Sequence, residues 1–177
     1  MKKLSVALVV GLFVALAVPA TAAAQAGEGR LDGFGVGLGY GTGITGVSLK
    51  TQLGDARAFQ AVIGCWGGYR NECYGIGGSA DLLFNMPIIT DEGSVALAWN
   101  VGGGGSIGFR DDGWARHPHR DRRGHSMWLA GQFVAGLEFL FPSVPLDLVI
   151  EWRPHLYIVP SIWLHFENFG FHVRYYF

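Results

Sequence analysis

A hydroxyl, an imidazole and a carboxylate that could form a hydrolytic site lie close together near the end of the chain, at Ser161, His165 and Glu167. Acyl transfer by such a trio requires that the imidazole take the hydroxyl proton while the carboxylate orients the imidazole. The three positions share only the parity of an extended strand, which gives the hydroxyl no contact with the imidazole. We therefore expect His165 to be an ordinary residue at a strand end, and we predict that the protein is not an enzyme.

The polar segment 110–125 holds the residues that could bind a metal ion. It contains five arginines, three aspartates and the pair His117 and His119. A His-x-His pair can ligate a metal, but a site needs further ligands at fixed geometry, and none is evident beside this pair. We interpret the segment as a solvated loop and predict neither a metal nor another cofactor.

The segment 41–46, GTGITG, is a literal G-x-G-x-x-G motif. A dinucleotide site needs a helix to begin there, so that free amide groups meet the pyrophosphate. The residues that follow, 47–53, instead alternate between apolar and polar side chains, which is typical of a strand. We therefore interpret the motif as a glycine-rich hairpin turn.

The two cysteines, Cys65 and Cys73, bracket a polar, glycine-bearing turn. In an exported protein they could form a disulfide that joins the two sides of one hairpin tip. The strand phases described below put them on opposite faces, so at least one must lie in the loop for them to meet. Two free thiols are the alternative, whereas a metal site is not expected because no suitably spaced His or Cys accompanies the pair.

The elements that must position these groups are strands, and residues 169–177 show the pattern most clearly. Apolar and aromatic residues alternate there with small, polar or charged ones, and the chain ends on Phe177. A period of two indicates an extended strand between two unlike surroundings. Seven earlier segments repeat the alternation, at 34–41, 47–53, 59–66, 74–85, 94–109, 127–141 and 146–153, and the phase of 59–66 is the least sharply defined.

With these phases, the ionisable side chains of the strands fall on one face. We predict that this face lines the interior of a closed barrel, because buried charges have to be paired and an eight-stranded barrel is just wide enough for side chains to fill. A gated pore is the alternative. The residues of this predicted structural charge network are Lys50, Asp81, Glu138, Asp147, Glu151, Arg153, His172 and Arg174.

The opposite face of every segment is apolar and uncharged. A soluble barrel or sandwich must offer water a polar face, and the polar face here is largely glycine, alanine and serine. A charged side chain turned toward lipid at mid-depth costs roughly 2–4 kcal/mol, so an uncharged face favours a bilayer. The sequence therefore predicts an all-β fold, an eight-stranded antiparallel up-and-down transmembrane β-barrel.

The N-terminal residues 1–26 predict a secretory signal peptide. Lys2 and Lys3 precede the apolar run 4–18, and Ala24-Gln25-Ala26 fits the small-x-small rule for cleavage. The apolar run is too short to span a bilayer. Residues 27–177 then form one barrel domain. The formal net charge of −1 offers no basic excess that would indicate a nucleic-acid partner.

Several short motifs are spread along the chain: FGVGLG (34–39), VSLK (47–50), FPSVPL (141–146), EWRP (151–154) and VRYYF (173–177). Together they resemble a group of small bacterial outer-membrane β-barrels of the OmpA/OmpX type. The resemblance implies a Gram-negative outer-membrane location, a monomer surrounded by membrane lipid and lipopolysaccharide, and recognition of Phe177 by the barrel-assembly machinery. It implies no established activity, so we expect a structural or surface-interaction role.

Two other functions follow from the same predicted fold. A lipid-A-modifying enzyme is one alternative, although no serine lies two residues from His165 as a lipid-A deacylase pattern would lead one to expect. A narrow channel is the other.

We also expect the loop arginines to contact lipopolysaccharide phosphates, because guanidinium pairs well with phosphate. These arginines are Arg116, Arg120, Arg122 and Arg123.

Overall fold

A computed structural model of the chain describes residues 30–41, 43–54, 56–66, 73, 75–91, 93–111, 125–141 and 143–177. The predicted signal peptide (1–26) and the four loop arginines Arg116, Arg120, Arg122 and Arg123 lie outside these residues. Within the described part of the chain, no helix has the length and apolar character needed to cross a membrane.

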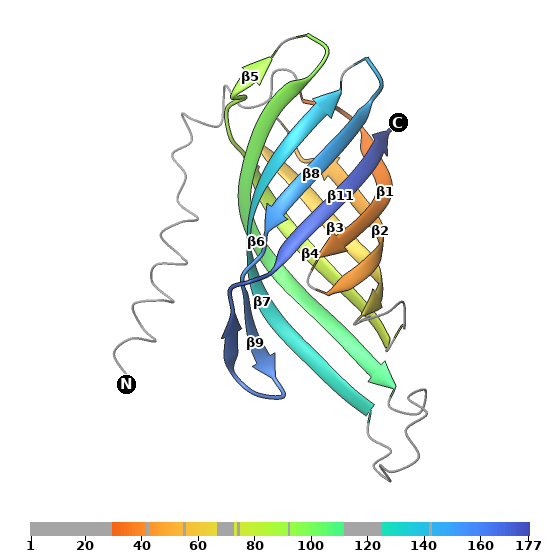
Figure 1. Cartoon of the computed structure of the whole chain (residues 1–177), viewed down its shortest axis with the longest axis vertical. Coiled ribbons are helices and arrows are strands. Elements are labelled where there is room, and N and C mark those ends of the chain that lie inside the picture. The colour runs from red at the N-terminus through yellow and green to blue at the C-terminus, as the bar shows by residue number, and fades with distance from the viewer. Residues whose placement is uncertain are drawn as a thin grey trace, which may run out of the picture.

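The described residues form one continuous sheet (Figure 1). Its strands are β1 (Phe34–Gly41), β2 (Ile44–Gln52), β3 (Arg57–Trp66), β4 (Gly75–Asn85), β5 (Thr90–Asp91), β6 (Ala96–Asp111), β7 (His125–Phe141), β8 (Leu146–Trp152), β9 (His155–Val159), β10 (Trp163–His165) and β11 (Phe169–Tyr176).

Eight of these strands close an antiparallel barrel in the order β1, β2, β3, β4, β6, β7, β8, β11. The barrel closes because β11 pairs with β1 as well as with β8. Each barrel strand is followed along the sheet by its successor in the barrel, so the topology is up-and-down. The predicted all-β, eight-stranded antiparallel barrel is confirmed.

The alternation that the sequence shows is also the alternation of faces in the barrel. In β3, whose phase was the least sharply defined, Phe59 points outward and is 41% exposed, whereas Gln60 points inward and is fully buried. Apolar side chains of the other barrel strands lie outside in the same way, and small, polar and charged ones lie inside. The predicted phases are therefore confirmed for all eight barrel strands.

The segment between β8 and β11 forms a hairpin that lengthens the barrel wall. β9 continues along β7 the pairing that β8 begins, without a change of register between them. Ala135 of β7 lies opposite Trp152 of β8, and Gln132 of β7 lies opposite His155 of β9. β10 then returns along β9 toward β11. The boundaries of this hairpin are not evident from sequence alternation, because its strands are only five and three residues long.

The two ends of the barrel carry different connections (Figure 1). The turns between β2 and β3 and between β7 and β8 lie at the end that holds the C-terminus, together with β5. β3 and β6 end, and β4 and β7 begin, at the opposite end, where the β9–β10 hairpin also lies. We call these the terminal end and the loop end.

Glycines on the inner face of β1 leave room for long side chains that cross the barrel. An added Cβ at Gly37 would lie 1.8 Å from the backbone oxygen of Val173, a distance that only backbone movement could relieve. Three other inward glycines of β1 lie against side chains: Gly35 against the Tyr176 ring, Gly39 against His172 and Ser48, and Gly41 against Arg153.

We predict that Gly37→Ala destabilises the barrel by about 1–3 kcal/mol, because the added methyl overpacks a site where the neighbour is backbone. Gly131→Ala is the matched control, since nothing lies within 4 Å of a Cβ added on that outward position of β7. Equilibrium urea unfolding followed by circular dichroism measures both. Equal stabilities of the two variants would show that the close approach at Gly37 does not constrain the fold.

Candidate functional site in the barrel interior

All eight residues of the predicted charge network lie inside the barrel. None of their side chains is more than 1% exposed. Arg30, which precedes β1, joins them and is also buried, so four cationic groups meet four carboxylates in the interior. Buried charges are tolerated when each is paired and hydrogen-bonded. The residues fall into three clusters, each held together by ion pairs and hydrogen bonds.

The first cluster surrounds Glu138 near the terminal end. Its carboxylate forms ion pairs with both Arg30 and Lys50. Asn100 donates its side-chain amide to the same carboxylate at 2.5 Å. Arg30 also donates to the backbone oxygens of Met86 at 2.9 Å and Trp99 at 2.8 Å. The residues ahead of β1 are thereby tied to the barrel interior.

The second cluster is built on Arg174 and Asp147, which are direct cross-strand partners in β11 and β8. The Arg174 Nε atom lies 3.0 Å from Oδ1 of Asp147, and Nη2 lies 2.8 Å from Oδ2. This two-point contact matches the planar guanidinium to the planar carboxylate. Tyr176 donates its hydroxyl to Asp147 at 2.8 Å, and Arg174 donates to Gln60 at 2.5 Å.

The third cluster places Arg153 between two carboxylates. Its Nη2 lies 2.5 Å from Oδ2 of Asp81, and its Nε lies 2.5 Å from Oε2 of Glu151. Gln132 donates to Asp81. Gln60 donates to Glu151 at 2.8 Å and thereby joins this cluster to the second. The second and third clusters therefore form one network, to which neighbouring and distant strands contribute.

Ser48, His172 and Glu151 form a hydroxyl–imidazole–carboxylate chain inside the third cluster. Ser48 Oγ lies 3.0 Å from His172 Nδ1, and His172 Nε2 lies 3.0 Å from Glu151 Oε2. A neutral imidazole satisfies both contacts by accepting from the hydroxyl and donating to the carboxylate. All three side chains are fully buried, and Gly39 packs against both Ser48 and His172. The geometry resembles a hydrolytic triad, but the hydroxyl faces no surface from which a substrate could approach.

The trio that the sequence offered for hydrolysis is not assembled. Ser161 lies in the turn after β9, His165 ends β10, and Glu167 lies exposed in the connection to β11. No hydrogen bond joins these three side chains, and His165 instead lies against the Trp163 ring at a centroid distance of 5.4 Å. Nor do the described residues contain a group of three or more metal-binding side chains.

Apolar layers border the ionic network at both ends. Toward the loop end, Ile44, Val62, Trp128 and Ala130 form a buried cluster against which Trp66 and Tyr157 pack. The Trp128 ring lies 5.5 Å from Trp66 and 5.7 Å from Tyr157, measured between centroids. Toward the terminal end, the layer consists of Leu31, Ala96, Ala98, Leu140 and Tyr176.

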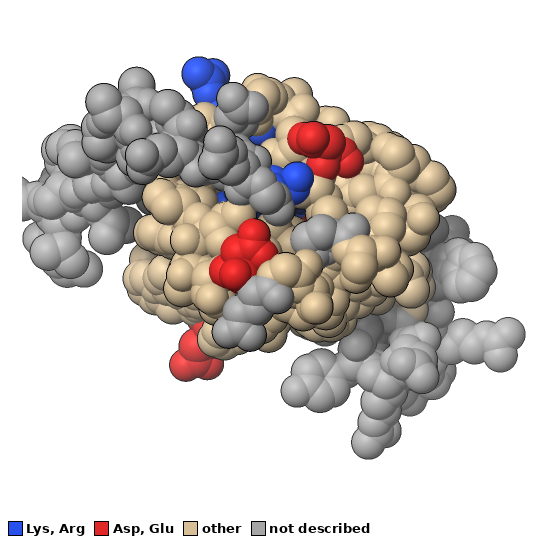
Figure 2. All heavy atoms as spheres, turned by 90° about the horizontal axis from the view of Figure 1, so that it is seen from above, with Lys and Arg blue, Asp and Glu red and all other residues tan. Residues whose placement is uncertain are grey.

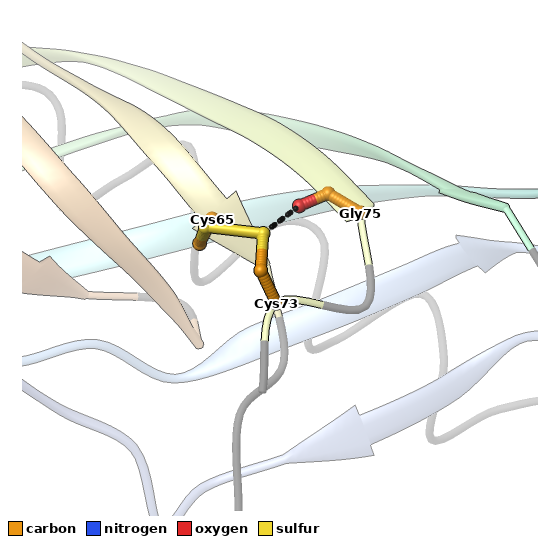
Figure 3. Close-up of a disulfide and its surroundings, with 3 residues drawn as sticks. All are labelled: Cys65, Cys73 and Gly75. Atoms are coloured by element: carbon orange, nitrogen blue, oxygen red, sulfur yellow. Dashed lines mark hydrogen bonds between the residues drawn. A yellow bond between two sulfur atoms is a disulfide. The ribbon is translucent and has the colours of Figure 1, made fainter. Parts of the chain in front are cut away.

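Cys65 and Cys73 form a disulfide at the loop end (Figure 3). Cys65 is the penultimate residue of β3 and points outward, whereas Cys73 lies in the connection that leads to β4. One of the two cysteines therefore lies in the loop. The disulfide required this, because the strand phases put the two on opposite faces. Their Cα atoms are 5.3 Å apart, and Cys73 Sγ lies 3.2 Å from the Gly75 backbone oxygen.

Phe177 extends the outward row of β11 at the terminal end. Its backbone nitrogen donates to the Phe34 oxygen at 3.2 Å, which anchors the last residue to the first barrel strand. Its ring packs edge-on against Tyr175 at a centroid distance of 5.0 Å, and the side chain is 81% exposed. The final aromatic is thus presented on the outside of the barrel.

Sequence reasoning missed several members of the interior network. Arg30 lies ahead of the first alternating segment, so no strand pattern points to it. Gln60, Gln132 and Asn100 are on the predicted inner faces but carry no charge, and only their parity could have identified them. The Ser48–His172 contact could have been found only from the register that brings β2 and β11 to either side of β1.

The fold and the site define a class, that of eight-stranded antiparallel β-barrels whose interior is closed by paired charges. No protein-family model, curated protein or solved structure matches this chain.

We predict that Asp147→Asn lowers the free energy of unfolding by about 3–5 kcal/mol, because it leaves the buried Arg174 without its anionic partner. The double variant Asp147→Leu with Arg174→Met removes both charges and should regain most of that loss. Asp91→Asn, at an exposed carboxylate in β5, is the control and should shift stability by no more than about 0.5 kcal/mol. Urea unfolding distinguishes these outcomes, and a single variant as stable as its control would contradict the role of the pair.

Proposed function

We propose that the protein is a bacterial outer-membrane β-barrel of the OmpA/OmpX type, exported by its signal peptide, with a structural or surface-interaction role. The observation that carries this proposal is the placement of charge. Among the described side chains of the barrel strands, the one charged residue on the outer face is Arg57, at the rim where β3 begins. The other charged residues of the eight barrel strands whose side chains are described lie inside.

The size of the apolar exterior supports the same proposal. Leu38 is 72% exposed and Ile76 is 69% exposed, and large apolar side chains surround the barrel on every strand. Monomeric soluble proteins rarely expose contiguous apolar patches larger than a few hundred Å². A bilayer removes this penalty, because hydrocarbon is then the medium that the outer face contacts.

Charge at the end of the barrel is consistent with this proposal. Figure 2, which looks onto the terminal end, shows Lys, Arg, Asp and Glu side chains on this end face. Outer-membrane barrels have short periplasmic turns and longer external loops. We therefore assign the terminal end to the periplasm and the loop end to the cell surface.

The partners we propose follow from this orientation. Lipid and lipopolysaccharide surround a monomeric barrel, and the loop arginines Arg116, Arg120, Arg122 and Arg123 contact lipopolysaccharide phosphates at the surface. The exposed terminal Phe177 is the residue that the barrel-assembly machinery would recognise. The closed network inside argues for a role exercised through the outer surface and the external loops, without catalysis.

We predict that the protein fractionates with outer membranes and runs as a heat-modifiable band on gels. Leu38→Arg should reduce the assembled fraction, because a charge facing lipid near mid-depth costs roughly 2–4 kcal/mol. Leu53→Arg is the control, since Leu53 lies exposed at the turn after β2, where a charge reaches water. A secreted protein that stays dissolved without detergent, with Leu38→Arg as well folded as its control, would refute the membrane location.

We predict that the purified barrel shows no conductance in a planar bilayer, because paired side chains and two apolar layers fill its interior. A porin inserted into the same bilayer provides the positive control, since its lumen is water-filled. Current steps that scale with the amount of inserted protein would instead establish the narrow channel.

A further inference from the structure

A hollow of about 430 Å³ lies on the outer face of the barrel, over β6, β7 and β8. It lies where Ala135 follows Phe133 in the outward row of β7 and precedes Leu137. Ala135 is the direct cross-strand neighbour of Val101 on one side and of Trp152 on the other. A single methyl group between larger side chains therefore creates the depression.

The walls of this hollow are apolar and are held in place. Trp99 and Val101 line one side, and Ile150, Trp152 and Phe169 line the other. The Trp152 indole donates to the Phe166 backbone oxygen at 2.8 Å, and its ring packs edge-on against Phe133. Asn100 and Glu151 also border the hollow, but their side chains are fully buried on the other face of the sheet. No ionisable group is therefore offered to an occupant.

The hollow reaches the terminal end of the barrel. Ile89, in the connection between β4 and β6, forms part of its lining, and its backbone nitrogen donates to the Leu97 oxygen at 2.8 Å. From there the hollow passes Trp99 and extends to Phe169, at the start of β11. An occupant could enter from the rim and lie across several strands.

We infer that this hollow binds one fatty-acyl chain of a phospholipid from the periplasmic leaflet, an inference that rests on the proposed membrane location and orientation. Lining without ionisable groups suits an occupant that is wholly hydrocarbon, and the volume falls in the range of small-ligand sites. The side chains of Trp99 and Trp152 project on two sides of the hollow, and each is 40% exposed. A flexible chain fits between these two side chains.

The test uses the full mature barrel in phosphatidylethanolamine nanodiscs that contain a trace of phospholipid with a diazirine in its acyl chain. After irradiation, mass spectrometry should find labelling concentrated on the peptides that contain Trp99, Ala135 and Trp152. Ala135→Phe fills the hollow and should lower that labelling by about tenfold, which corresponds to about 1.4 kcal/mol. Ala80→Phe, at an exposed outward position of β4, is the matched control and should leave it unchanged.

Heat-modifiable mobility of both variants establishes that they are folded. Even labelling around the barrel, or labelling at Ala135 that Ala135→Phe does not reduce, would overturn the inference and leave the proposed membrane location intact. Cross-links between two copies that disappear in Ala135→Phe would assign the hollow to a second barrel and also overturn it. A wild-type chain that does not enter nanodiscs would refute the membrane location itself, and the inference with it.

Discussion

Neutralisation of charge inside a narrow barrel is the constraint on which the rest of this structure depends. Lys50, Arg153 and Arg174 could balance only three of the four interior carboxylates. Arg30 supplies the fourth cation through Glu138, so the residues ahead of β1 must enter the barrel for the interior to be neutral. An unpaired buried charge costs several kcal/mol, which is comparable with the whole stability of a domain. The interior of the closed barrel is therefore neutral only when Arg30 is in place beside Glu138.

The same constraint explains the distribution of small residues. Inward glycines on β1 are needed because the guanidinium of Arg153, the imidazole of His172 and the ring of Tyr176 occupy the space that side chains there would take. The apolar residues inside form three small clusters, two of them toward the ends of the barrel, and most apolar side chains lie on the outer face. This distribution is the reverse of a water-soluble domain, in which the interior is apolar and the surface charged.

The sequence was sufficient to predict the class of fold and the face of each strand, because an alternation of period two is a local property. It was not sufficient to predict which interior charges meet. Asp81 contacts Arg153 across 72 positions, and that contact depends on the stagger of the strands around the barrel rather than on any local pattern. Arg30 was missed for a related reason, since it belongs to no strand. The β9–β10 hairpin was missed because its strands are too short for alternation to be recognised.

The filled interior also contains the hydroxyl–imidazole–carboxylate chain. Ser48, His172 and Glu151 have the groups and distances of a reactive trio, yet the Glu151 carboxylate is shared with Arg153 and Gln60 and serves the charge balance. The Ser48 hydroxyl reaches this carboxylate only through His172, and all three side chains are fully buried. The outer face and the loop end instead hold apolar and aromatic side chains that are exposed and neutralise no charge.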